Sequence, residues 1–292
     1  MQSKSGQTKS SLFSWWLIAV TAATMGAFAT NSLLTRLAFQ TTTIDPVTFT
    51  SVRLISGAVI LLLINGARGQ RPTWGTHGWL SAILLFMYAT AFSFAYRGLD
   101  TGTGALVLFA SAQLLMVGVG YIRGERTNLW GVALALAGLV VFLAPSDSAP
   151  PLGYAALMLV AGMAWGGFSL AGRADASPML STMNSFLLTV PLTLILLWLN
   201  RYALEPNTLG IIYAMTTGCV TSALGYVVWY WVRVRMTAIT AGTVQLSVPI
   251  LSAILGVLIL DETLSTRNVI AALVVLLGIG LTTRRTRAVS NT

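Results

Sequence analysis

The sequence predicts an all-α membrane protein in which ten transmembrane helices form two inverted five-helix repeats. The composition, the spacing of the apolar runs and an internal repeat at an offset of 137 residues support this fold class. Of the 292 residues, 55% are hydrophobic and 9% are charged, whereas a soluble domain carries about 25% charged residues. A soluble fold of this size has no interior large enough for so many apolar side chains. The lipid bilayer is therefore the expected solvent.

Cutting the chain at charged residues and at stretches rich in proline, glycine and asparagine leaves ten apolar runs. A helix needs about 20 apolar residues to cross the hydrocarbon core, and only helices or closed barrels satisfy their backbone in lipid. The runs are long and do not alternate, which argues against barrel strands. We expect helices near residues 14–38, 46–66, 76–97, 102–122, 128–144, 151–172, 179–199, 208–232, 236–259 and 266–283.

The positive charges indicate how these helices are oriented, because Lys and Arg favour the cytoplasmic side of a membrane. With the N-terminus inside, twelve Lys and Arg residues fall in inner segments and four in outer segments, and Arg53 lies within a helix. We expect both termini to be cytoplasmic, in a bacterial inner membrane. Anionic lipid accounts for the net charge of +9 without a nucleic-acid partner. We expect the chain to be a monomer in the bilayer.

Residues 103–125 and 240–262 match at a constant offset of 137, with five identities in 23 positions. The identical pairs are Thr103 and Thr240, Val107 and Val244, Leu114 and Leu251, Ile122 and Ile259, and Glu125 and Glu262. Residues 1–146 would then hold the first repeat and residues 147–292 the second. Because five is an odd number, the second repeat enters the membrane from the opposite side. Inverted repeats are typical of secondary transporters, whose substrate site lies at the midplane between them.

Three motifs carry a resemblance to a known family. "GERTNLWGVALALAG" and "DETLSTRNVIAALVVLLGIG" each place a Glu and a short polar turn before a helix with glycines, and "DPVTFTSVRLISGAVIL" begins a helix at Pro46. Over about residues 14–283 the chain resembles the EamA-type branch of the drug/metabolite transporter superfamily. Within that branch it looks most like the YddG-type exporters of aromatic and other amino acids. It departs from a strict repeat in having Ser185 where a counterpart of Arg53 is expected.

Pro249 stands near the middle of the ninth apolar run. A proline inside a helix removes one backbone donor and crowds the carbonyl four residues earlier, which here belongs to Gln245. In lipid that carbonyl needs a partner or a water-lined surface. We expect either a packing kink or a hinge for alternating access at Pro249, and either a packing or a substrate role for Gln245.

Three charged residues are candidates for a gate. Glu125 and Glu262 end their helices, where a carboxylate opposes the helix dipole. We expect each to cap the following helix or to pair with a nearby arginine (Arg123, Arg126 or Arg267), with a gate as the alternative. Arg53 lies roughly 10 Å below Pro46 at about 1.5 Å per residue. A charge at that depth is a functional hypothesis, and snorkelling to the outer interface is the alternative.

The expected central site combines aromatic rings with a few uncharged polar groups, which suits small amphipathic ligands such as amino acids. The candidate substrate-binding residues are Met25, Asn31, Tyr88, Phe92, Ser111, Gln113, Trp165, Phe168, Tyr226 and Gln245. Trp165 lies in "GMAWGG", where the small residues permit close helix contact. For any single ring, helix packing or lipid contact is the alternative.

Other functional classes lack their expected residues. No Asp or Glu lies in the central part of a predicted helix, and His77 and Cys219 are single residues of their type. We therefore expect no metal, no cofactor and no enzyme activity, and a channel would need a polar stripe on several helices. The chain is expected to export aromatic and other neutral amino acids, or similar small metabolites, by facilitated alternating access. A proton-coupled transporter of drugs or of nucleotide-sugar-type metabolites is the alternative.

Overall fold

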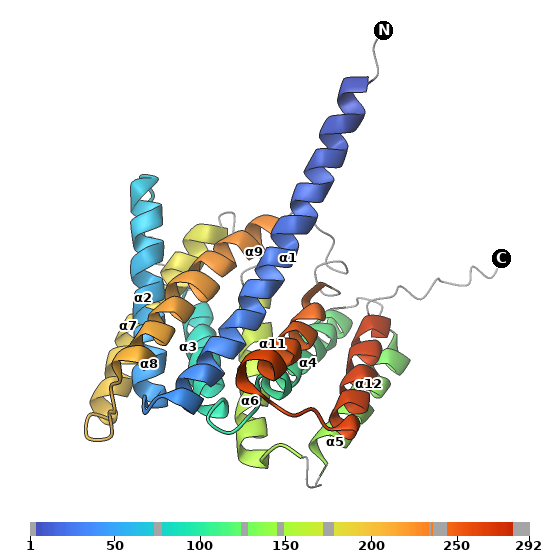
Figure 1. Ribbon diagram of the computed structural model, residues 1–292. Helices are drawn as coiled ribbons and strands as arrows, with labels where there is room; N and C mark the ends of the chain where they lie inside the picture. Colours follow the sequence, from blue (N-terminus) through green and yellow to red (C-terminus); the bar gives the residue numbers. More distant parts are fainter. Residues whose placement is uncertain are drawn as a thin grey trace, which may run out of the picture.

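The structure, a computed structural model, describes residues 4–72, 78–123, 128–144, 149–171, 178–233, 235 and 244–282. These residues form helices and connecting turns, and no strand occurs among them. The helices in Figure 1 are α1 (Lys4–Thr41), α2 (Pro46–Ala67), α3 (Gly78–Ala95), α4 (Thr101–Ile122), α5 (Leu129–Leu143), α6 (Leu152–Ala171), α7 (Pro178–Leu199), α8 (Thr208–Thr216), η1 (Thr217–Leu224), α9 (Gly225–Arg233), α11 (Ser247–Leu260) and α12 (Thr266–Thr282). The predicted all-α class is confirmed for this part of the chain.

Each of the ten predicted apolar runs overlaps helical structure. Among the described residues, seven helices are long and apolar enough to cross a membrane. One of them is the continuous run of α8, the π-helix η1 and α9, whose apolar span is Thr208–Trp229. Three further apolar helices, α5, α11 and α12, contain 15, 14 and 17 residues. These three are shorter than a full crossing needs, so the ten-span count stays a prediction.

The start of α2 illustrates how local sequence sets a helix boundary. Asp45 has an extended backbone conformation, and its Oδ1 accepts hydrogen bonds from the backbone N–H groups of Val47 and Thr48, both at 2.9 Å. Pro46 follows at the first helical position, where its missing N–H leaves no acceptor unsatisfied. The Asp-Pro pair thus begins α2 at the residue that the sequence predicted.

The helices pack into a layered bundle with α1 crossing its middle (Figure 1). At one end α2 packs on α7, and at the other end α5 packs on α12. Between these pairs, α6 packs on α3 and α4, while α1 packs on α11 and along the run from α8 to α9. The central helices of the bundle are therefore contributed by both halves of the chain.

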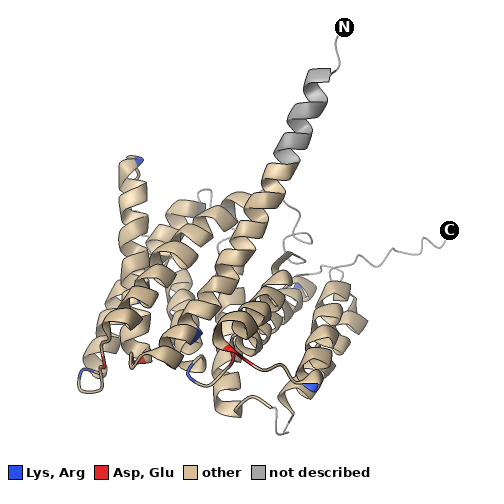
Figure 2. Cartoon of the chain, viewed as in Figure 1, with Lys and Arg blue, Asp and Glu red and all other residues tan. Residues whose placement is uncertain are grey.

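The outer surface of the bundle is apolar. On α2, Val59, Leu62 and Leu63 are exposed, and on α11 Ile250, Ile254 and Leu258 are exposed. Charged residues gather mostly at the ends of the helices (Figure 2). Apolar flanks with charged ends are what a bilayer requires of a protein that it surrounds, so lipid is the expected neighbour of these faces.

Gly162 lets α6 approach α4 closely. A Cβ atom at this position would collide with the Ser111 hydroxyl and the Leu108 carbonyl oxygen, and it would lie 3.1 Å from the Leu108 carbonyl carbon. A Cβ at Gly166, one turn later, would lie 2.9 Å from the carbonyl oxygen of Ala112. The close helix contact predicted from the "GMAWGG" motif is therefore present, and it brings Trp165 into the centre of the bundle.

Candidate functional site

Eight buried aromatic rings meet where the central helices cross. This aromatic cluster consists of Phe28 (α1), Tyr88 and Phe92 (α3), Trp165 and Phe168 (α6), Phe186 (α7), and Tyr226 and Trp229 (α9). On α3, α6 and α9 the two rings are three or four residues apart, the spacing that puts both on one face of a helix. Each ring is at most 6% exposed. The cluster therefore belongs to the interior, and helix periodicity alone places most of its members there.

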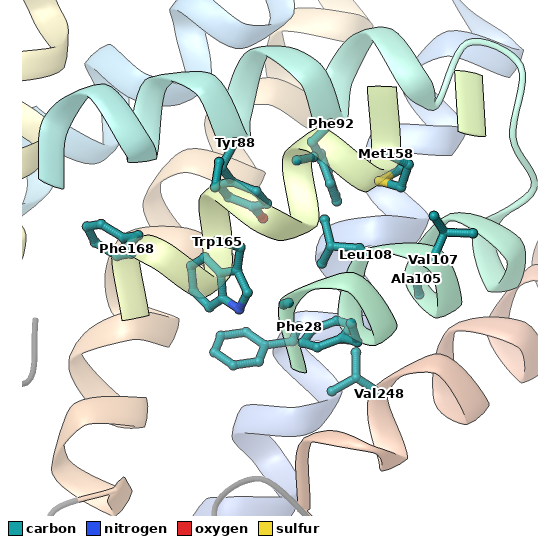
Figure 3. Packing of buried hydrophobic residues seen from close by; sticks show 14 of the residues in the cluster. Phe28, Tyr88, Phe92, Ala105, Val107, Leu108, Met158, Trp165, Phe168 and Val248 are labelled. Carbon is teal, nitrogen blue, oxygen red and sulfur yellow. The ribbon is translucent and has the colours of Figure 1, made fainter. Parts of the chain in front are cut away.

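Trp165 is the centre of the aromatic cluster. Its ring centroid lies 5.0 Å from that of Tyr226, 5.1 Å from Tyr88, 5.8 Å from Phe168 and 6.2 Å from Phe28. These are the separations at which aromatic pairs attract each other. Figure 3 shows the side chains of Tyr88, Trp165, Phe168 and Phe28 turned toward one another.

Arg53 contributes a charge to the edge of the cluster. Its side chain is 1% exposed, and its guanidinium carbon lies 4.9 Å from the Phe92 ring centroid and 5.3 Å from that of Tyr88. Its Nε donates to Ser222 Oγ at 3.2 Å, and one terminal nitrogen donates to the Tyr88 hydroxyl at 3.1 Å. Arg53 does not snorkel to an interface, because these bonds and rings hold it inside.

Gly218 explains how η1 reaches Arg53. A Cβ at Gly218 would collide with the backbone carbonyl oxygen of Arg53 and with the Ser56 hydroxyl. The missing side chain lets η1 pack on α2, and Ser222 then lies one turn further along, beside the guanidinium. Single π-helical turns occur frequently at functional sites, and this one carries the hydroxyl that orients the buried arginine.

A second set of polar groups links three helices through Asn31. The Asn31 amide nitrogen donates to the Tyr88 hydroxyl at 3.4 Å, and its amide oxygen accepts from the Thr221 hydroxyl at 3.1 Å. The Tyr88 hydroxyl also accepts from Arg53. The polar edge of the cluster is therefore a connected network of Thr221, Asn31, Tyr88, Arg53 and Ser222 in which every contact crosses between helices.

The other predicted site residues lie in three different settings. Gln113 donates to the side-chain oxygen of Gln245 at 3.4 Å, so the two buried amides lie together. Ser111 donates to the carbonyls of Val107 and Leu108 in its own helix, so its hydroxyl serves the backbone. Met25 is 1% exposed and belongs to the same apolar core as the aromatic cluster.

Two buried donors of the site have no hydrogen-bond partner among the described residues. They are Nη1 of Arg53 and Nε1 of Trp165. Buried donors are nearly always bonded in native proteins, so an exception calls for an explanation. Both residues contact the Tyr88 ring.

Glu262 has a different role from the one that its position in the sequence suggested. Its carboxylate accepts from the backbone N–H and the hydroxyl of Thr101 and lies 3.7 Å from Arg36 Nε. It therefore caps α4, not the following helix, and its ion-pair partner is Arg36. The turn that aims it begins at Asp261, which has a left-handed φ of 53°, a conformation that Asp tolerates. Glu125, its counterpart in the sequence repeat, lies outside the described residues.

A helix break occurs near Pro249, where a kink was predicted, and a hinge role stays a prediction. The described helix α11 begins at Ser247, so Pro249 lies in the first turn after the break. Proline is well tolerated there, because the N–H groups of a first turn have no partner in the helix. The interruption itself falls at Leu246, directly after Gln245. His77, the single histidine, lies outside the described residues.

Several residues of the site were not predicted from the sequence. Phe28 contacts Trp165, Tyr226 and Trp229, and its place three residues after Met25 and three before Asn31 could have revealed it. Ser222 and Thr221 could not have been found in that way, because their role depends on the π-helical turn. Within the described residues, no group of three or more His, Cys, Asp or Glu side chains is placed to hold a metal ion.

Comparisons with known proteins agree with this architecture. The EamA-like transporter family matches residues 152–284. An uncharacterized protein of Pseudomonas aeruginosa is 45% identical and covers 90% of this chain and 93% of its own length. Uncharacterized transporters of Bacillus subtilis (22% identical, 82% and 88% covered) and Archaeoglobus fulgidus (25%, 92% and 99%) are also similar.

A solved structure shares the fold. It superimposes with a TM-score of 0.61 at 18% sequence identity and covers 89% of this chain and 98% of its own. The apolar helices and the relatives that match over most of their length therefore agree with the family match. Residues 152–284 therefore match the EamA-like transporter family, and the described helices are those of a multi-pass membrane protein.

Proposed function

We propose that the protein exports aromatic and other neutral amino acids across the bacterial inner membrane by facilitated alternating access. The observation that carries the proposal is the aromatic cluster with a polar network at one edge. Amino acids combine an apolar or aromatic side chain with two polar ends, and apolar sites with a few placed polar groups bind such ligands. The network of Thr221, Asn31, Tyr88, Arg53 and Ser222 supplies the polar groups.

The proposed mechanism requires two equivalent halves of five helices each, residues 1–146 and 147–292, with both termini cytoplasmic. The helix contacts support this arrangement. In this repeat α1 corresponds to α6, α2 to α7, α3 to the run from α8 to α9, α4 to α11 and α5 to α12. The contact of α4 with α6 then corresponds to that of α11 with α1, and the contact of α3 with α6 corresponds to that of α9 with α1. Both members of each pair occur, and α2 with α7, α4 with α11 and α5 with α12 pair with each other.

The aromatic cluster supports the same symmetry. Phe28 and Trp165 are 137 positions apart and contact each other, and Phe92 and Trp229, also 137 apart, are both in the cluster. Residues close to a two-fold axis meet their own counterparts, so we place the axis between Phe28 and Trp165. A substrate site on such an axis faces either side of the membrane when the halves exchange conformations.

The chemistry of the described site disfavours the alternative substrates. An organic-cation exporter is expected to hold a buried carboxylate in its site, yet the described acidic residues lie at helix ends or in loops. A nucleotide-sugar site needs several buried cations for phosphates, and Arg53 is the one Lys or Arg among the buried residues described.

Reconstituted transport tests the proposal. Purified protein in proteoliposomes would be given radiolabelled phenylalanine, methionine and threonine, with lysine, glutamate and a sugar phosphate for comparison, with and without a pH gradient. Neutral amino-acid flux that ignores the pH gradient is expected. Absence of amino-acid flux would reject the substrate class, and flux that requires a proton gradient would reject the facilitated mechanism.

A further inference from the structure

We propose that Arg53 binds the carboxylate of the substrate, so that the site recognises amphipathic monocarboxylates and does not require their amino group. The inference rests on the proposed function for the location of the site, and it defines the substrate class more closely. It also assigns a role to the residue for which the sequence left both a gate and snorkelling open.

Arg53 is a buried cation without a buried anion beside it. The ion pairs of the described residues join Arg36 to Asp100 and to Glu262, and neither involves Arg53. A guanidinium stays protonated in proteins, so burial cannot neutralise it. A buried charge is tolerated when it is paired and hydrogen-bonded, and the described protein supplies the hydrogen bonds without the opposite charge.

The hydrogen bonds of Arg53 leave one edge of its guanidinium open. Nε is bonded to Ser222 and Nη2 to Tyr88, which fixes the plane of the group. Nη1 is buried and has no partner in the part of the chain that the structure describes. Carboxylates are the ligands that a guanidinium binds best, through parallel charge-assisted hydrogen bonds. The fixed plane and the open nitrogen therefore suit a ligand carboxylate.

The rings beside Arg53 determine what can be attached to that carboxylate. The guanidinium lies over Tyr88 and Phe92, and the Tyr88 ring contacts Trp165, which contacts Phe28 and Tyr226. The rest of a ligand bound to Arg53 would lie against aromatic rings. The open Nε1 of Trp165 adds a second donor and suits a further acceptor of the ligand.

The amino group of an amino acid has a weaker set of partners. The polar groups around Asn31 are amides and hydroxyls, which accept from an ammonium but do not neutralise it. The carboxylates of Asp100 and Glu262 already form ion pairs with Arg36. One end of the substrate would thus meet a full opposite charge and the other would meet neutral dipoles. Recognition by the carboxylate follows.

Ligand binding to purified wild-type protein in detergent, measured by calorimetry, tests this directly. The ligands would be phenylalanine, 3-phenylpropionate (which lacks the amine), phenylalaninamide and 2-phenylethylamine (which lack the carboxylate). Phenylalanine and 3-phenylpropionate are expected to bind at least roughly tenfold more tightly than the other two, since a hydrogen bond to a charged group is worth that much. Equal binding of phenylalaninamide and phenylalanine would overturn the inference.

Variants separate carboxylate binding from a merely structural role. Arg53→Gln should weaken the binding of phenylalanine and 3-phenylpropionate roughly tenfold or more and abolish the preference for them over phenylalaninamide. Arg53→Lys should keep part of that preference. Arg201→Gln, on an exposed turn where the guanidinium stacks on Tyr202, is the matched control and should change nothing. A structural role would weaken all four ligands equally, which would reject the inference.

Ser222→Ala serves if Arg53→Gln does not fold. It removes the acceptor that orients Nε. The affinity for the two carboxylate ligands should fall several-fold, while the affinity for 2-phenylethylamine should stay unchanged. An equal effect on all ligands would again count against the inference. If phenylalanine flux is absent while 3-phenylpropionate binds through Arg53, the amino-acid proposal fails and the carboxylate site stands. If phenylalanine is transported but Arg53→Gln keeps full selectivity, the carboxylate site fails and the amino-acid proposal stands.

Discussion

The carboxylate of Glu262 accepts hydrogen bonds from the backbone nitrogen of Thr101 at 2.8 and 2.9 Å and from its hydroxyl at 2.8 Å, although the two residues are 161 positions apart. Thr101 begins α4, and Asp100 before it makes no side-chain capping bond. A side chain from the second half of the chain thus caps a helix of the first half. Arg36 of α1 completes this junction.

Loss of that cap is expected to destabilise the protein. Glu262→Ala removes both acceptors of Thr101 and should lower the free energy of unfolding by about 1–2 kcal/mol, or the melting temperature by about 2–6 °C. Glu262→Gln keeps one acceptor and should lose less. Thermal unfolding in detergent measures both. Glu205→Gln, at an exposed position, is the control, and an Ala variant as stable as that control would contradict the capping role.

The same carboxyl predicts how stability depends on pH. Burial raises the pKa of Glu262 above its ordinary value of 4.5, and Asp100 adds to the rise, while Thr101 and Arg36 oppose it. The folded protein therefore keeps this proton at pH values where the unfolded chain has lost it. Its contribution to the unfolding free energy is present below pH 4.5 and declines as the pH rises through the raised pKa.

This pH effect is isolated by comparing variants. Chemical unfolding at a series of pH values should show the wild type losing stability relative to Glu262→Gln as the pH rises above 4.5. Glu205→Gln should follow the wild type. If the difference between wild type and Glu262→Gln stays constant with pH, or grows in favour of the wild type, the raised pKa is wrong.

Packing between α4 and α6 depends on the small residue at position 162. Gly162→Ala places a methyl group against the Ser111 hydroxyl and the Leu108 backbone, and overpacking of this kind costs about 1–3 kcal/mol. Gly153→Ala, in the same helix with nothing within 4 Å of its Cβ, should be neutral or slightly stabilising. Thermal unfolding of the two variants side by side decides the point, and equal melting temperatures would contradict it.

Trp165 offers a test of the aromatic cluster in transport. Trp165→Phe keeps an apolar ring but loses Nε1–H and part of the contact with Tyr88 and Tyr226. We expect the KM for phenylalanine to rise about three- to tenfold, the size of one aromatic contact. Trp198→Phe, 63% exposed on α7, should leave uptake unchanged. Equal KM values for the two variants would remove Trp165 from the site.

The periodic part of the structure could be predicted from the sequence. Apolar runs gave the helices because lipid leaves the backbone few other conformations. Tyr88, Phe92, Trp165 and Phe168 were named as aromatic residues of the apolar runs, and the structure puts them in contact in pairs. Gln113 was named for its polarity and Gln245 for its position four residues before Pro249, and the structure brings the two together.

The contacts between halves could not be predicted in the same way. Glu262 has arginines nearer in sequence than Arg36, and local spacing gives no reason to prefer a partner more than two hundred positions away. The burial of Arg53 within the membrane region was expected from its place in the second apolar run, but its partner Ser222 depends on a π-helical turn that no sequence period predicts. The predicted break near Pro249 falls at Leu246, and Pro249 lies in the first turn of the helix that follows, where proline fits well.

Helix α1 carries Phe28 and Asn31 of the site and, five residues further, Arg36 of the junction with Glu262. These positions span about 12 Å of one helix. A substrate bound at the proposed site and the ion pair of Arg36 with Glu262 would therefore both act on α1. By thermodynamic linkage, any factor by which the intact junction raises the affinity for substrate is also the factor by which bound substrate stabilises the junction.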